Sequence, residues 1–92
     1  MKVMVEFFAY LREKTGTPGM DVTFIGSTVM DLIGALDGMF LGAFRDQLME
    51  GEELKGMVKV LVNGVDVRAL RGLNTELKET DVVSIFPPAA GG

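Results

Sequence analysis

The chain has no cysteine and no histidine among its 92 residues. Without cysteine it cannot form disulfide bonds or thiolate metal sites, and without histidine it has no imidazole base. Zinc sites built from Cys and His are therefore excluded, as are nucleophilic sites built from Ser-His or Cys-His pairs. Any chemistry must use a carboxylate, an amine, a hydroxyl group or the chain ends.

Basic residues are also scarce, because nine Lys and Arg stand against 13 Asp and Glu, which gives a formal net charge of −4. Affinity for nucleic acid comes largely from clustered Lys and Arg that neutralise phosphates. The basic residues here are scattered in the way typical of a solvated surface, as for Arg12, Lys59, Arg68 and Arg71. We therefore expect no nucleic-acid partner.

Long apolar runs are missing as well, and none is long enough to span a bilayer. Glu6, Arg12 and Glu13 interrupt the first residues, where a signal peptide needs an uninterrupted apolar stretch. We expect a cytoplasmic protein that has no membrane partner. A chain of 92 residues that is 48% hydrophobic and 24% charged has the composition of one small globular domain.

Alternation of apolar and polar residues predicts the strands. It is clear over 2–9 and again over 20–26, so these two strands are expected to pair antiparallel through a long connection. Residues 57–70 contain two β-rich runs around Asn63-Gly64, a pair that favours a type I′ hairpin turn. A last strand over 81–86 is stopped by two prolines, which cannot donate to a ladder.

The spacing of residues after Thr28 predicts the main helix. Thr28 and Asp31 resemble a capping box, and apolar residues follow at i, i+3, i+4 and i+7 (Val29, Leu32, Ile33 and Leu36), so we expect a helix that ends near Gly38. A shorter helix is expected within 40–50, an exposed loop at 51–56 and a polar turn at 73–81. One main helix over a mixed sheet predicts an α+β domain over 1–86, with the first and last strands in the centre.

The last residues, 87–92, are expected to form a flexible C-terminal tail. Pro87 and Pro88 favour an extended exit, and the small residues after them add little to the backbone (Ala89, Ala90, Gly91 and Gly92). Such a thin segment fits a narrow channel, and glycine lets an enzyme approach the backbone from every side. The group within reach would be the carboxylate of Gly92. A frayed terminus is the ordinary alternative.

Three large apolar side chains are expected on the sheet face opposite the core. The alternation puts Phe8, Leu61 and Phe86 on this side, and it puts the core residues on the other (Val5, Phe7, Val60, Val62 and Ile85). A register error of one residue would return all three to the core. Periodicity alone therefore leaves open whether these residues form a partner surface.

Three segments together resemble a known family. They are "FFAYLREKTG" (7–16), "VLVNGVDVR" (60–68) and "IFPPAAGG" (85–92), and they are similar to the small subunit of molybdopterin synthase, a ubiquitin-like sulfur carrier. The resemblance covers essentially the whole chain and implies a β-grasp fold, a mixed sheet covered on one face by one main helix. Thr80 stands where relatives commonly carry glycine.

The resemblance also implies a function in molybdenum or tungsten cofactor synthesis. Gly92 would be adenylated by an E1-like adenylyltransferase that uses ATP, receive sulfur by way of a sulfurtransferase, and become a thiocarboxylate. The tail of Pro87, Pro88, Ala89, Ala90 and Gly91 would then carry it into the large subunit of the synthase, where the sulfur is donated to a pterin precursor. By the same resemblance, Phe8, Leu61 and Phe86 would contact partners.

The residues agree with a carrier role. The chain has no GxxxxGK[ST] motif for ATP, so we expect a partner to perform the activation, with no cofactor and no metal held by this chain. The absence of cysteine means that the sulfur comes from elsewhere. The chain would be a substrate and carrier subunit rather than a free-standing enzyme.

Three alternatives stay open. A ubiquitin-like modifier would join Gly92 to lysines of target proteins after the same activation step. A carrier of the thiamine pathway is usually shorter and lacks Phe-Pro-Pro before its tail. A plain interaction domain would have no chemistry at its terminus.

Overall fold

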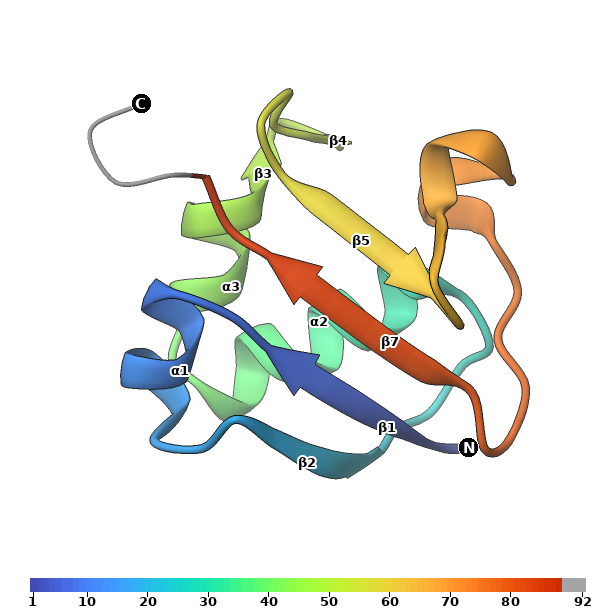
Figure 1. Ribbon diagram of the computed structural model, residues 1–92, viewed down its shortest axis with the longest axis horizontal. Coiled ribbons are helices and arrows are strands. Elements are labelled where there is room, and N and C mark those ends of the chain that lie inside the picture. Colours follow the sequence, from blue (N-terminus) through green and yellow to red (C-terminus); the bar gives the residue numbers. More distant parts are fainter. Residues whose placement is uncertain (89–92) are drawn as a thin grey trace.

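The computed structural model describes residues 1–88, and residues 89–92 lie outside the described part. Five strands form one mixed sheet in the order β2-β1-β7-β5-β6 (Figure 1). Their bounds are Lys2–Phe7 (β1), Gly19–Thr23 (β2), Lys59–Val62 (β5), Val65–Asp66 (β6) and Val82–Phe86 (β7). β1 runs parallel to β7 and antiparallel to β2. The predicted antiparallel pairing of the first two strands and the central position of the first and last strands are confirmed.

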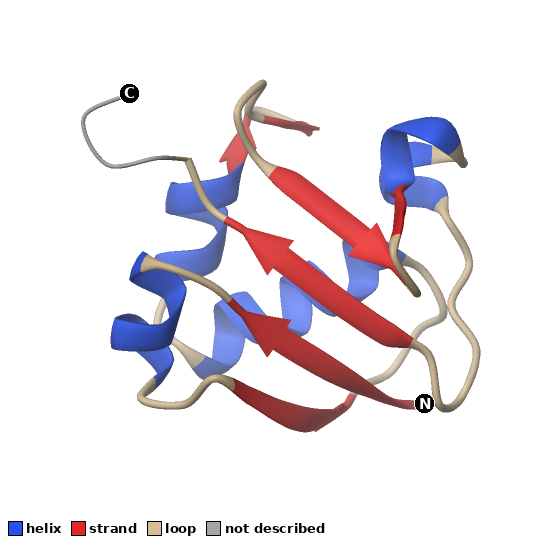
Figure 2. Ribbon diagram, in the orientation of Figure 1, coloured by secondary structure: helices blue, strands red, loops and turns tan. Residues whose placement is uncertain are grey.

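The main helix, α2 (Val29–Met39), covers one face of this sheet, as Figure 2 shows. It begins with the predicted capping box, in which the Thr28 hydroxyl accepts from the Asp31 backbone N–H at 3.2 Å. The Asp31 carboxylate in turn accepts from the backbone N–H groups of Ser27 at 2.9 Å and Thr28 at 3.1 Å. These hydrogen bonds lower the pKa of Asp31. The four apolar residues predicted to face the core are all buried (Val29, Leu32, Ile33 and Leu36).

The core lies between α2 and the sheet. Every second residue of β1 is buried, and the same holds for the core side of β5 and the end of β7 (Val3, Val5, Phe7, Val60, Val62, Val83 and Ile85). This burial confirms the strand register that the alternation predicts. The opposite side of the sheet, called the outer face below, carries Met4, Glu6, Leu61, Ser84 and Phe86.

Two further elements differ from the sequence prediction near the N-terminus and the middle of the chain. A six-residue helix, α1 (Tyr10–Thr15), occupies the stretch expected to be only a connection. Its single buried residue, Leu11, gives too short a pattern to detect. The predicted short helix is present as α3 (Ala43–Leu48). The expected exposed loop after it instead belongs to a two-stranded sheet formed by β3 (Met49–Glu50) and β4 (Glu53–Leu54).

The segment after the Asn63-Gly64 turn is also less β-like than predicted. Asn63 and Gly64 have φ angles of 50° and 86°, as the predicted type I′ turn requires. β6 then ends after two residues, and the chain continues as the 3-10 helices η1 (Val67–Ala69) and η2 (Gly72–Asn74). Asp66 stops the strand because its carboxylate accepts from the Arg68 backbone N–H at 2.8 Å and caps η1.

Candidate functional site

The candidate site begins where β7 leaves the sheet. β7 is the middle strand, and its C-terminal end lies beside the end of β1 (Figure 1). Phe86 is half-buried, Pro87 is buried and Pro88 is half-buried. We call Phe86, Pro87 and Pro88 the tail root. The remaining predicted tail residues lie outside the described part of the chain (Ala89, Ala90, Gly91 and Gly92).

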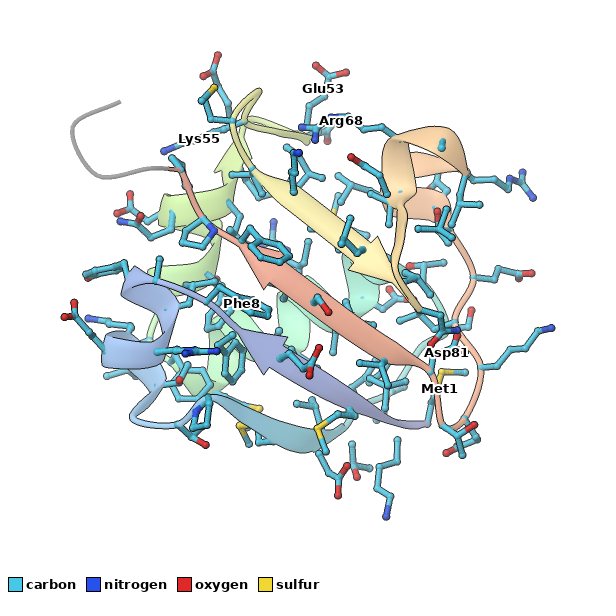
Figure 3. The ribbon with its side chains drawn as sticks, viewed as in Figure 1. Met1, Phe8, Glu53, Lys55, Arg68 and Asp81 are labelled. Carbon is cyan, nitrogen blue, oxygen red and sulfur yellow. The ribbon has the colours of Figure 1, made fainter. Side chains whose placement is uncertain are left out.

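Two predicted partner residues meet at the tail root. The rings of Phe8 and Phe86 are stacked, with centroids 4.1 Å apart and an interplanar angle of 11°. Figure 3 shows Phe8 at the end of β1, on the side of the sheet that faces the viewer. The guanidinium carbon of Arg12 lies 5.0 Å from the centroid of the Phe8 ring, which is cation–π distance. The Nε of Arg12 also donates to the Phe7 carbonyl oxygen at 2.7 Å.

The third predicted residue, Leu61, lies on the same face one strand further. In the register of β5 and β7 it stands opposite Ser84, and Lys59 stands opposite Phe86. Leu61 is therefore a diagonal neighbour of Phe86 and is half-buried. The structure thus places all three residues on the outer face, and their contact with a partner stays a prediction.

A polar pair in the centre of the outer face is not found by sequence reasoning. Ser84 is 9% exposed, and its hydroxyl donates to Oε1 of Glu6 at 2.9 Å. The signal in the sequence is the single serine in the apolar run "VVSIF". The role of Arg12 left no comparable signal, because it depends on α1, which the pattern does not predict.

Two clefts lie away from the tail root. The larger, about 440 Å³, lies between β4 and the 3-10 helices and is lined in part by Glu53 and Arg68, both labelled in Figure 3. The Arg68 guanidinium donates to the backbone carbonyls of Val58 and Lys55, so it holds the loop in place. A second cleft of about 390 Å³ lies by Tyr10 and Asp46. Within residues 1–88, no group of three or more His, Cys, Asp or Glu is placed to hold a metal ion.

None of the helices in the described residues is long and apolar enough to cross a membrane.

The sequence profile of the ThiS family matches residues 5–92. The chain belongs to the ThiS family. It is 36% identical to the small archaeal modifier protein 3 of Haloferax volcanii over the full length of both chains. It is 34% identical to the sulfur carrier protein CysO of Mycobacterium tuberculosis, again over the full length of both.

Solved structures of ThiS-like chains give the same result. The small archaeal modifier protein 1 of Methanosarcina acetivorans matches with a TM-score of 0.82 and 35% identity, over 99% of this chain and 96% of that one. A chain of the Amycolatopsis orientalis BexX/CysO complex matches at 0.79 and 34%, over 98% and 99%. A putative molybdopterin converting factor, subunit 1, of Pyrococcus furiosus matches at 0.77 and 30%, over 97% and 99%. The predicted ubiquitin-like β-grasp fold and sulfur-carrier family are confirmed.

Proposed function

We propose that this ThiS-family chain is the sulfur carrier of molybdopterin synthesis, which makes the molybdenum or tungsten cofactor. An E1-like enzyme adenylates the Gly92 carboxylate with ATP, and sulfur delivered by a sulfurtransferase turns it into a thiocarboxylate. The large subunit of molybdopterin synthase then receives the tail, and the sulfur passes to the pterin precursor. The likeness to the putative converting factor subunit of Pyrococcus furiosus supports this role.

The observation that carries the proposal is the position of the tail root. β7 is the middle strand, so the rigid centre of the sheet ends at Pro87 and Pro88. Phe8 and Phe86 lie next to this exit on the outer face. A partner that docks on the outer face would therefore meet the tail at the edge of its own contact surface, close to where a channel for the tail must open.

The activation step explains why the tail consists of small residues. A carboxylate is a poor acyl donor, so one of its oxygens must first attack the α-phosphorus of ATP, with pyrophosphate as the leaving group. A sulfur nucleophile then attacks the acyl carbon, and AMP leaves. Both steps need the carboxylate held close to the reacting atoms with water excluded, which a side-chain-free backbone allows.

A second candidate, a ubiquitin-like protein modifier, is favoured by the 36% identity to the small archaeal modifier protein 3. The activation of Gly92 is the same in this case. The acyl carbon is then attacked by the amine of a target lysine, and an isopeptide bond forms with AMP as the leaving group.

Mass spectrometry of the chain from its native host tests the proposal. We expect intact chains in which one C-terminal oxygen is replaced by sulfur, and a strain without the E1-like enzyme should lack them. A modifier leaves a different mark. Because Lys78 is the last basic residue, trypsin would leave residues 79–92 attached to a target lysine. Branched peptides without thiocarboxylate would replace the carrier by the modifier, and the absence of both products would contradict both.

A further inference from the structure

The stacked pair at the tail root has a geometry that docking area alone does not require. Phe8 and Phe86 spend much of their surface on each other, at a centroid distance of 4.1 Å, and both are half-buried. Arg12 adds a third group, with its guanidinium 5.0 Å from the Phe8 ring and its Nε bound to the Phe7 carbonyl oxygen. The ring of Phe8 is thus held by contacts within the chain.

The backbone that follows Phe86 has few conformations available. Phe86 and Pro87 each precede a proline, which restricts them to extended backbone, and both prolines have a fixed φ angle. Pro87 is buried, while the Phe86 ring lies on the outer face against Phe8. The tail root is therefore held from both sides of the sheet, and the direction of the chain beyond Pro88 follows from the orientation of Phe86.

We propose that Phe8 is a positioning residue for the reaction at Gly92, and this inference rests on the proposed function. Through its stack on Phe86 it sets the direction in which the tail leaves the sheet. The four residues beyond Pro88 span at most about 14 Å, so a tilt of about 15° at the root displaces the end by about 4 Å. Misplacement of a reacting group by about 1 Å can cost on the order of a hundredfold in rate.

This role differs from that of a docking residue in the kinetic constant that it changes. A lost docking contact weakens the binding of the carrier and raises KM, whereas a misdirected tail lowers kcat after binding. Leu61 is the matched comparison, because it lies on the same outer face but stands opposite Ser84 rather than at the end of β7.

The test is ATP–pyrophosphate exchange by the E1-like enzyme of the host, with this chain as the varied substrate. Phe8→Leu keeps an apolar side chain but removes the ring, and we expect kcat to fall about tenfold or more, with KM changed less than about threefold. Phe8→Tyr retains the ring and should restore kcat. Leu61→Ala should raise KM. If Phe8→Leu raises KM and leaves kcat unchanged, Phe8 is only a docking residue and the inference is overturned.

A second measurement separates this inference from the proposed function. Nitrogen-15 relaxation of the Phe86 amide reports whether the stack holds the root, with no partner present. We expect a lower order parameter in Phe8→Leu and the original value in Phe8→Tyr. An unchanged order parameter in Phe8→Leu overturns the inference. No exchange with the intact chain, together with a loosened Phe86 in Phe8→Leu, would contradict the proposed function but leave the stack as the element that directs the root.

Discussion

The hydroxyl group of Ser84 donates a hydrogen bond to Oε1 of Glu6 at 2.9 Å, between the parallel strands β7 and β1. The pair lies in the same row of the outer face as Leu61. A carboxylate therefore stands among the apolar residues expected to meet a partner. A partner that covers this face must supply a donor or a positive charge for Glu6, because a buried charge left unpaired is strongly unfavourable.

Reversing the charge of Glu6 should affect binding more than folding. Glu6 is exposed, so we expect Glu6→Lys to change the free energy of unfolding by no more than about 1 kcal/mol. Association with the E1-like enzyme should weaken about tenfold or more. Calorimetric titration and thermal unfolding measure the two effects. Asp21→Lys, the same change on the edge strand β2, is the control, and an equal loss of affinity in both variants would rule out a specific role for Glu6.

Neighbouring residues of β5 should respond in opposite ways to the same substitution. Leu61 is half-buried on the outer face, whereas Val62 is 7% exposed and part of the core. We expect Leu61→Glu to remain folded and to bind its partners weakly, and Val62→Glu to unfold, because a core carboxylate has no partner there. Circular dichroism and a binding assay check this pair. Unfolding of Leu61→Glu without a specific binding defect would contradict the position of Leu61 on a partner surface.

Thr80 has a φ angle of 74°, a left-handed conformation that is unfavourable for a β-branched residue. This is the position where relatives commonly carry glycine. Thr80→Gly should stabilise the fold by about 1 kcal/mol, since it removes the steric conflict of the Cβ atom. Denaturant unfolding measures the change, and Thr80→Ala, which keeps the Cβ atom, should gain much less. Equal gains in both variants would show that the backbone conformation is not the cause.

The Asp31 cap should make part of the stability depend on pH. Backbone N–H groups of Ser27 and Thr28 hold the pKa of Asp31 below its ordinary value of 3.8. The carboxylate thus stabilises the folded state above the unfolded-state pKa, and this contribution is lost as the pH falls through the lower, folded-state pKa. The difference in Tm between the intact chain and Asp31→Asn should be largest near neutral pH and should shrink below that value. A difference that is constant down to acid pH would contradict this.

The sequence was sufficient for the parts of the fold with long, regular patterns. The capping box at Thr28, the four buried positions of α2 and the Asn63-Gly64 turn are local signals, and each is present as predicted. The short elements were missed because their patterns are brief. α1 has one buried residue, and β3 and β4 have two residues each. Tertiary contacts decide such segments more than local preference does.

The candidate site was predictable only in part. Alternation placed Phe8, Leu61 and Phe86 on one face, but it gives no information on which of them touch. The stack of Phe8 on Phe86 depends on the parallel pairing of β1 with β7, which joins segments far apart in the sequence. The contact of Arg12 with Phe8 depends on a helix that begins at Tyr10. Neither relationship has a local pattern.

The most direct test of the central claim, that the Gly92 carboxylate is the reactive group, is ATP–pyrophosphate exchange by the E1-like enzyme with three forms of the chain. They are the intact chain, the chain without Gly92 and the chain with one Ala appended. Either change moves the terminal carboxylate by about 3 Å, so we expect exchange with the intact chain and at least about a hundredfold loss with both others. All three should unfold at the same temperature. Exchange at the intact rate with either altered chain would contradict the carrier and the modifier functions together.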